Sequence, residues 1–377
     1  MNKIKIMIQK VKTVYVLGAG FSMDAKAPSQ ERIVENIFDV FSAKDNQIIP
    51  DEKMKAFKKF LSNTLGIPAK LHKTIPLEDI FTPLDRCISD NVAFRNLSVD
   101  ELREKRQLVI ELIGITLKEL LGNTQHDYIN KFAKHLVNAA RSRRLGKGGD
   151  QDKVAVISTN WDILLDNAIY GELSSSSEKP EVVDYCCYIS SYRENDETVK
   201  PGLYALAKGG FNVKLLKLHG SMNWLQCPRC QRLYTTFNQK IAVDTNRPNC
   251  RHCDRNFGSE QSQRLAQNLI MPTFLKDLSN PQYKIIWQNA GIELSEAKKI
   301  VFIGYSLPQA DFEMRQLLSR MIAKGTEIEV VDFESPKDNG EAYRKLIATY
   351  KQFFGNPKVK GFGKGAKHYI ENDLQLI

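Results

Sequence analysis

The 377-residue sequence lacks an apolar run of the length that crosses a membrane. No stretch reaches the roughly 18 apolar residues that a spanning helix needs, and the run at 14–17 is too short for the core of a signal peptide. We therefore expect a cytoplasmic protein without a membrane partner. Core-building residues are not lacking, because 42% of the chain is hydrophobic and 9% is aromatic, which excludes an intrinsically disordered protein.

Cysteine is scarce, and its seven copies are an odd number that cannot form a complete disulfide framework. Four of them form two Cys-x-x-Cys pairs with nineteen residues between the pairs: Cys227, Cys230, Cys250 and Cys253. A pair at this spacing can direct both thiolates at one metal ion, and two pairs complete a tetrahedral site. The quartet therefore predicts a Zn²⁺ site without an open position, which is structural and not catalytic.

The net charge of +10 permits contact with nucleic acid or with an anionic ligand. The basic residues are spread along the chain, and direct nucleic-acid binding is not the favoured interpretation. Zinc ribbons often bind nucleic acid, however, and Arg229 and Arg251 stand inside the two cysteine pairs. A zinc-bearing module that binds nucleic acid or senses a nucleotide is therefore one alternative for this protein.

Five short, mostly apolar runs predict buried strands, at 13–17, 153–158, 214–218, 299–303 and 328–331. Continuous apolar strands that alternate with helices are typical of a parallel, doubly wound sheet. We predict an α/β fold in which a Rossmann-like sheet carries a small four-cysteine zinc module and a helical insertion. The Rossmann-like domain takes 1–28, 151–225 and 263–377, the mostly helical insertion takes 29–150, and the zinc-ribbon-like module takes 226–262.

A polar motif follows each predicted strand. These motifs are Gly18-Ala19-Gly20-Phe21-Ser22, Thr159-Asn160-Trp161-Asp162, His219, Gly304-Tyr305-Ser306 and Asp332. Because ligands of such sheets bind at the carboxyl ends of the strands, we expect the motifs to form one composite site. The first motif opens a dinucleotide-binding fingerprint, in which glycines let a pyrophosphate approach a helix N-terminus, but Met23 replaces its third glycine.

Each motif also has a plain structural interpretation. The glycines suit any strand-to-helix turn, with Ser22 and Asp24 as helix caps. Asn160 and Asp162 are residue types favoured in turns and caps as well. His219 has the side chain of a general base near neutral pH, yet a lone histidine is more often a hydrogen-bonded structural residue. The joint occurrence of the motifs at strand ends is what favours a functional site.

The order of the motifs resembles that of the sirtuin superfamily. The sequence reads Gly-Ala-Gly-x-Ser, Thr-x-Asn-x-Asp, His-Gly, two Cys-x-x-Cys pairs and Gly-x-Ser-Leu, in the order that the family shows. The resemblance covers about 11–28 and 153–335 and leaves 29–150 unmatched. It implies that NAD⁺ binds between a Rossmann-like domain and a small module that holds structural Zn²⁺.

The resemblance also implies roles for individual residues. Asn160, His219 and Asp162 are the expected catalytic residues, with His219 as the base that acts on the ribose. The expected NAD-binding residues come from the same strand ends: Gly18, Ala19, Gly20, Ser22, Asp24, Thr159, Gly304, Ser306 and Asp332.

Two segments depart from the pattern of the sirtuin deacylases. Lys26-Ala27-Pro28-Ser29-Gln30 stands where those enzymes carry Gly-Ile-Pro-x-Phe-Arg, and Met271-Pro272-Thr273-Phe274 stands where they carry the acyl-lysine channel motif. The chain thus looks more like the bacterial SIR2-like NADases of antiphage defence. We expect an NAD⁺ glycohydrolase that releases nicotinamide and ADP-ribose or its cyclic isomer. A sirtuin-type protein-lysine deacylase is the other alternative.

Enzymes of this kind are toxic when they are unregulated, so the resemblance also implies partners. We expect a homo-oligomer, and we expect the helical insertion at 29–150 to be a contact site for a regulator. A DNA-translocating ATPase of the HerA type is one such partner.

Overall fold

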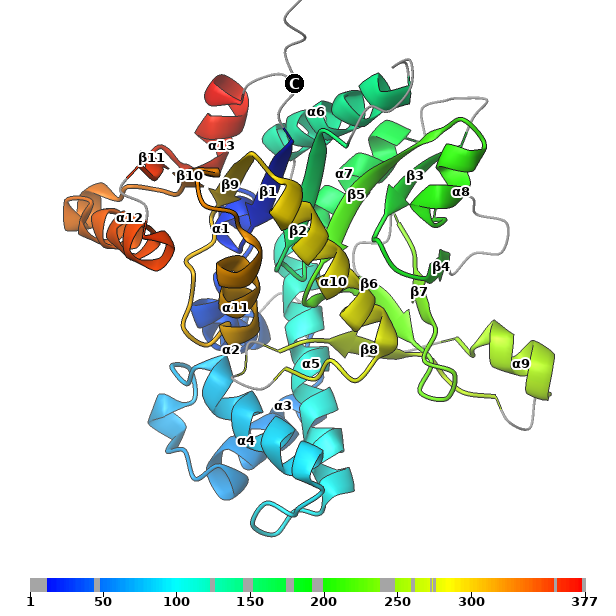
Figure 1. The fold of residues 1–377 in the computed structure, drawn as a ribbon. Coiled ribbons are helices and arrows are strands. Elements are labelled where there is room, and N and C mark those ends of the chain that lie inside the picture. Colours follow the sequence, from blue (N-terminus) through cyan, green and yellow to red (C-terminus); the bar gives the residue numbers. More distant parts are fainter. Residues whose placement is uncertain are drawn as a thin grey trace, which may run out of the picture.

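The structure is a computed structural model. It describes residues 12–43, 48–122, 126–144, 152–173, 180–191, 199–237, 248–258, 262–271, 273, 276–355 and 358–374. Two sheets and a group of helices make up the fold (Figure 1).

The larger sheet has seven parallel strands in the order β11-β10-β9-β1-β2-β5-β3. Thr13 lies opposite Val154 on one side and Lys299 on the other, so the first strand of the chain is central. This confirms the predicted parallel α/β sheet. Its strands are β1 (Thr13–Leu17), β2 (Val154–Ser158), β3 (Glu181–Asp184), β5 (Phe211–Lys217), β9 (Lys299–Ile303), β10 (Glu327–Val331) and β11 (Lys360–Phe362).

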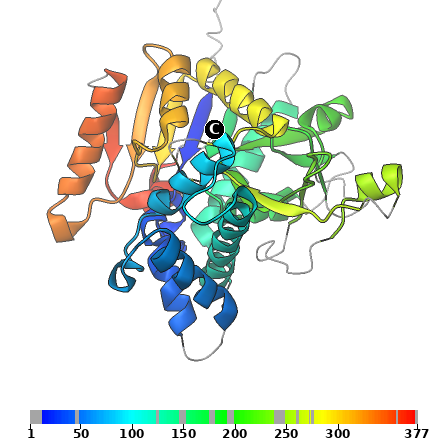
Figure 2. The same ribbon diagram turned by 90° about the horizontal axis from the view of Figure 1, so that it is seen from below.

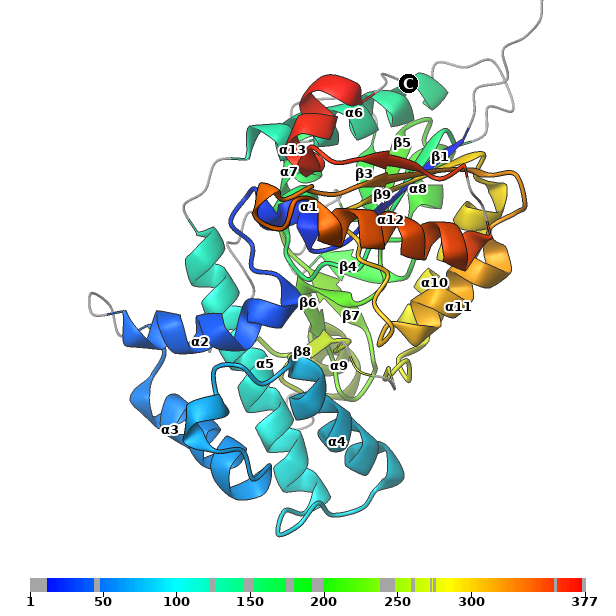
Figure 3. The same cartoon turned by 90° about the vertical axis from the view of Figure 1, so that its left-hand side faces the viewer.

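Helices cover both faces of this sheet, which is why its central strands are mostly apolar. Every residue of β1 and β2 is buried. In Figure 3, α6 (Asp127–Arg144) and α13 (Gly365–His368) lie on one side of the sheet. On the other side lie α10 (Pro281–Glu296), α11 (Phe312–Met321) and α12 (Glu341–Phe354). The helix α7 (Leu164–Leu173) follows β2 and contacts α6.

A second sheet of four strands has the order β4-β7-β6-β8. Its strands are β4 (Ile189–Ser191), β6 (Gly220–Gln226), β7 (Leu233–Thr235) and β8 (Ala266–Leu269). The predicted zinc module, 226–262, supplies only part of this sheet, because β6 starts directly after His219 and β4 and β8 lie outside the predicted bounds. Of that module, 238–247 and 259–261 lie outside the described residues.

The helices between β1 and β2 form a second core at one end of the molecule (Figures 1 and 2). These are α2 (Ile33–Ser42), α3 (Asp51–Lys59), α4 (Leu77–Asp90) and α5 (Val99–Leu121), with a π-helical turn at Phe60–Thr64. The helix α5 begins at a capping box, in which the Ser98 and Glu101 side chains bond each other's backbone N–H groups. This group accounts for the predicted insertion only up to about residue 122.

The predicted insertion at 29–150 also contains α6, which packs on the larger sheet instead. Phe132 and Leu136 of α6 belong to the core of that sheet. An apolar stripe along a helix predicts burial but does not identify the surface it packs against, so the sequence could not place this boundary.

The remaining described elements are short: α1 (Gly20–Met23), α8 (Gly202–Ala207), α9 (Arg251–Phe257), and helical turns at Gln30–Arg32, Ala69–Leu71, Pro336–Asp338 and Tyr369–Asp373. Among the described helices, we find none with the length and apolar character that crossing a bilayer requires.

Candidate active site

A cavity of about 330 Å³ lies at the carboxyl ends of the parallel strands. After β1 the chain forms β2, β3 and β5 on one side, where β5 lies between β2 and β3, and it then crosses back to form β9, β10 and β11 on the other side. The order of strands therefore reverses between β1 and β9, which is where such sheets bind ligands. Most of the predicted site residues line this cavity: Ala19, Gly20, Thr159, Asn160, Asp162, His219, Gly304, Ser306 and Asp332.

Two glycine-containing loops meet at the floor of the cavity. The N–H of Gly20 donates to the carbonyl of Gly304 over 2.9 Å. A Cβ on Gly20 would lie 2.6 Å from the Gly304 Cα, and Gly304 itself has a φ of +62°. Close approach of the two loops thus requires both glycines and leaves bare backbone facing the cavity.

Asn160 is held by its amide nitrogen. Its Nδ2 donates to the carbonyl oxygen of Gly18 over 2.9 Å and lies 3.5 Å from the Oγ of Ser22. The backbone N–H of Asn160 donates to Ser158 Oγ over 3.2 Å. With Nδ2 engaged, Oδ1 is the atom of this amide that is available to accept a hydrogen bond from a ligand in the cavity.

Asp162 is a half-buried residue that lines the cavity beside Asn160. Its Oδ2 accepts from Ser22 Oγ over 2.9 Å, and its Oδ1 accepts from the backbone N–H of Leu164 over 3.1 Å, so it also caps α7. Burial raises the pKa of Asp162 above its usual value, and the nearby Lys217 and the Ser22 hydrogen bond offset only part of this effect.

His219 lies in the turn between β5 and β6 and faces a carboxylate that the sequence did not reveal. Its Nε2 is 3.4 Å from Oδ1 of Asp311, the N-cap residue of α11. The same Oδ1 is 2.9 Å from Lys276 Nζ, and Oδ2 accepts from the Tyr305 hydroxyl over 2.7 Å. Asp311 also lines the cavity. In the sequence, Asp311 could have been noticed only as an acidic residue at the start of a helix, shortly after the Gly304 motif.

The pKa values of the Asp311 and Asp162 carboxyl groups are shifted in opposite directions. Burial alone would raise the pKa of Asp311, but the charges and hydrogen bonds of His219 and Lys276 hold it well below its usual range. For Asp162, Lys217 and the Ser22 hydrogen bond offset the effect of burial only in part, and its pKa is raised. Neighbouring groups whose pKa values are driven apart are typical of sites that transfer protons.

Three predicted NAD-binding residues do not line the cavity. Gly18 and Ser22 lie behind its wall, where they fix Asn160 and Asp162. Asp24 follows the short helix α1, and its Oδ2 accepts from the backbone N–H of Lys367 over 3.2 Å. Its carboxylate is thus engaged at the first turn of α13, and its role in binding NAD stays a prediction.

The helical group supplies another wall of the cavity that the sequence did not predict. Glu78 of α4 and Leu117 of α5 line it, together with Gln30. Gln30 Nε2 donates to Glu78 Oε1 and so joins the loop after β1 to the helical group. No local pattern marks Glu78, because its approach to the cavity depends on how two distant segments pack.

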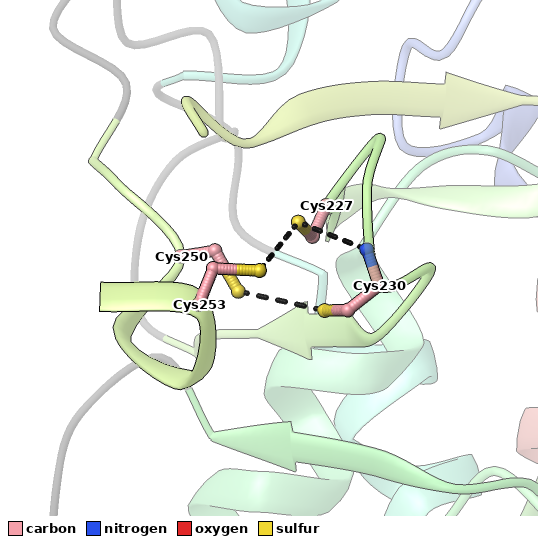
Figure 4. A group of neighbouring side chains, drawn as sticks. All are labelled: Cys227, Cys230, Cys250 and Cys253. Atoms are coloured by element: carbon pink, nitrogen blue, oxygen red, sulfur yellow. Dashed lines mark hydrogen bonds between the residues drawn. The ribbon is translucent and has the colours of Figure 1, made fainter. Parts of the chain in front are cut away.

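The four predicted zinc ligands lie together at the other end of β6 (Figure 4). Their sulfur atoms are all within 4.8 Å of one another, and the Cys227–Cys253 and Cys230–Cys250 sulfur pairs are each 3.7 Å apart. A tetrahedron with metal–sulfur bonds of about 2.3 Å has its sulfur atoms about 3.8 Å apart. The arrangement fits Zn²⁺ with four thiolate ligands and therefore a structural site.

Comparison with known proteins gives matches among solved structures. No family model and no curated protein matches the sequence. One similar structure is a complex of a Sir2 homologue with NAD, which is 14% identical, covers 97% of this chain and 89% of its own, and has a TM-score of 0.42. A mutant Sir2 homologue with ADP-ribose is 13% identical over 97% of this chain and 91% of its own, with a TM-score of 0.39. At these identities the likeness concerns the fold alone.

Proposed function

We propose that this protein is an NAD⁺ glycohydrolase, which cleaves NAD⁺ to nicotinamide and ADP-ribose. The observation that carries the proposal is the convergence of Asn160, Asp162 and His219 on one cavity at the switch point of a parallel sheet. The motif order that resembles the sirtuins assigns NAD⁺ to such a cavity.

The cavity offers a suitable group for each part of the dinucleotide. The backbone of Ala19 and Gly20 suits the pyrophosphate, because no side chain keeps the phosphates away. Asp332 follows β10 and suits the hydroxyl groups of the adenosine ribose, as acidic residues do in other Rossmann-like sites. The nicotinamide ribose is then placed beside Asn160, Asp162 and His219.

The reaction breaks the bond between the ribose C1′ and the nicotinamide nitrogen, which leaves with the bonding electrons. A water oxygen forms the new bond to C1′, and the water loses one proton. We assign the acceptance of a hydrogen bond from the ribose or the water to Asn160 Oδ1, and the removal of the proton to His219. We assign to Asp162 a contact with the nicotinamide amide, whose N–H group can donate a hydrogen bond to a carboxyl oxygen.

Water is favoured over an acyl-lysine as the nucleophile by the surroundings of the cavity. Pro28, Ser29 and Gln30 line it where deacylases carry Phe-Arg, and Gln30 is bonded to Glu78 of the helical group. Met271 and Thr273 are buried in the interior. Pro272 and Phe274 of the same segment lie outside the described residues.

The test is to incubate the purified protein with NAD⁺ and to measure nicotinamide and ADP-ribose by chromatography. Asn160→Ala and His219→Ala should each lower nicotinamide release by on the order of 10²-fold or more while the circular dichroism spectrum is unchanged. An acetyl-lysine peptide is added in a parallel reaction. Deacetylation that outpaces hydrolysis would favour the deacylase, and the absence of nicotinamide release with and without activators would exclude the proposal.

We further propose that the enzyme depletes NAD⁺ as a regulated effector of antiphage defence in the cytoplasm. The helical group lines the cavity through Glu78 and Leu117, so a partner bound there could change the shape of the active site. A second copy of the chain and a HerA-type ATPase are the partners we propose. Mass measurement by light scattering, with and without the ATPase, tests both, and a monomer under both conditions would argue against them.

A further inference from the structure

A buried set of charged groups connects His219 to the helix α11. Asp311 is 5% exposed, and the Lys276 side chain is completely buried. Lys276 Nζ lies 2.9 Å from Asp311 Oδ1 and 3.0 Å from Glu313 Oε2. Burying charged groups costs free energy unless each group is paired. The presence of a buried carboxylate and a buried lysine beside the candidate base therefore indicates a functional role for them.

The ring of His219 is oriented toward this set. His219 Nε2 and Asp311 Oδ1 are both buried, and His219 Nε2 makes no hydrogen bond of regular geometry within the described part of the chain, whereas Asp311 Oδ1 is paired with Lys276. They face each other at 3.4 Å. Catalytic hydrogen bonds are often long before the ligand binds, and a buried polar atom without a partner points to a function.

Further contacts limit how far these groups can move. The Tyr305 hydroxyl donates to Asp311 Oδ2 over 2.7 Å, and Tyr305 is itself buried after β9. The Trp287 ring lies 6.4 Å from the His219 ring, and its Nε1 donates to the Leu218 carbonyl over 3.2 Å. The imidazole is thus restrained on one face by α10 and on its Nε2 edge by Asp311.

We propose that Asp311 is the positioning residue of His219. We also propose that Lys276 partly offsets the negative charge that Asp311 presents to the His219 ring. In this arrangement His219 Nε2–H donates to Asp311, which leaves the lone pair of Nδ1 facing the cavity. Nδ1 then takes the proton from the attacking water as the water oxygen bonds to C1′ and nicotinamide leaves with its electron pair. Asp311 stabilises the resulting imidazolium. Lys276 offsets the charge of the Asp311 carboxylate, so that Nδ1 is not already protonated before the reaction.

The proposal rests on the proposed hydrolysis for its catalytic step, but the charge coupling can be measured without NAD⁺. The chain has six histidines, and the His219 C2–H signal is assigned by its loss in His219→Asn. In Asp311→Asn the titration midpoint of this signal should fall by about one pH unit or more, because Lys276 remains without the carboxylate. In Lys276→Met it should rise by a similar amount, because the carboxylate remains without the lysine.

The same variants are then compared in NAD⁺ hydrolysis. Asp311→Asn should lower kcat by on the order of 10²-fold with a smaller change in KM, and the acidic limb of its pH–rate profile should move in the same direction as the titration. Lys276→Met should move that limb in the opposite direction. The double variant Asp311→Asn/Lys276→Met removes both charges. It replaces a single variant in the titration and the rate profile if that single variant does not fold.

Asp373 provides a matched control. Its Oδ2 lies 3.3 Å from Nδ1 of His368, a second Asp–His pair of similar length, but both side chains are more than a third exposed. Asp373→Asn should leave kcat and the His219 titration unchanged.

Opposite shifts of the titration with matching shifts of the rate profile would support the proposal. Unchanged titration in Asp311→Asn, Lys276→Met and the double variant would overturn it, and so would an altered titration with an unchanged kcat. If the wild type releases no nicotinamide, the proposed function fails, whereas the titration still decides whether Asp311 and Lys276 control the charge of His219.

Discussion

The two polar centres of this chain lie at opposite ends of one strand. His219 precedes β6 and Cys227 follows it, so the seven residues of the strand separate them by roughly 23 Å. The cysteine centre is complete in itself, because its four sulfur atoms lie close enough together to supply all four ligands of a tetrahedral Zn²⁺ site. The His219 centre contains a buried atom, His219 Nε2, that makes no regular hydrogen bond among the described residues. Two centres that are close in sequence therefore have different proposed roles: the cysteines stabilise the fold, and His219 takes part in the reaction.

The strongest test of this contrast is the replacement of Cys227 and Cys230 by serine. Losing structural Zn²⁺ should lower the free energy of unfolding by on the order of 5 kcal/mol or more, because the binding of the metal stabilises the fold. A thermal melt with and without a chelator measures the loss. Cys87→Ser, at a half-buried cysteine of α4 outside the cluster, is the control and should melt close to the wild type.

His219→Ala should give the opposite result, a melting temperature near that of the wild type with nicotinamide release almost abolished. The cysteine variant is also assayed at a temperature where it is still folded. If it then loses turnover to the same extent as His219→Ala, the two centres do not have separate structural and catalytic roles. The metal centre would then contribute to the chemistry across the length of β6.

A smaller effect is expected where the two glycine loops meet. A Cβ at Gly304 would lie 2.2 Å from the carbonyl carbon of Gly20, and the φ of +62° disfavours any other residue. Gly304→Ala should cost about 2–3 kcal/mol of stability and should also lower turnover, because the cavity floor must shift.

Gly325→Ala is the matched control for that change. Gly325 has a φ of +95°, and no atom lies within 4 Å of the position that an added Cβ would take, so the substitution introduces backbone strain without a collision. It should cost about 1 kcal/mol and leave turnover unchanged, as urea denaturation and the NAD⁺ assay would show. Equal losses in the two variants would mean that contact between the loops does not shape the site.

The sequence predicted the part of the fold that depends on local pattern. The runs at 13–17 and 299–303 coincide with β1 and β9, because buried parallel strands are apolar along their whole length. Their polar ends converge because parallel strands share one edge. The strands β3 and β11 were missed, since both are short and lie at the edges of the sheet.

Contacts between distant segments are what the sequence could not provide. Asp311 meets His219 only because α11 follows β9, and β9 returns to the centre of the sheet. Glu78 reaches the cavity only through the packing of α4. Neither residue stands in a pattern that marks it, whereas Asn160 and His219 directly follow predicted strands.

Acid should weaken the reaction site in a way that Asp311 controls. The folded-state pKa of Asp311 is held below its unfolded value of about 3.9, so its contribution to stability is present above that pH and is lost as the pH falls toward the folded pKa. The melting temperature of the wild type should therefore change little from pH 7 to pH 5 through this group and fall below about pH 4. Asp311→Asn should lack this component, and identical acid dependence in both proteins would contradict the assignment.

The smallest predicted effect concerns Ser22, which supports the site from behind the cavity wall. Ser22 is fully buried, and its Oγ donates to Asp162 Oδ2 over 2.9 Å. Ser22→Ala should cost about 1 kcal/mol, the usual net value of one hydrogen bond, and should raise KM more than it lowers kcat because Asp162 and Asn160 lose a restraint. Ser42→Ala, which removes a 2.8 Å bond to the Phe38 carbonyl in the helical group, should have a similar effect on stability and none on KM. If both variants leave KM unchanged, the hydrogen bond of Ser22 behind the cavity wall only stabilises the fold, as the cysteine centre does.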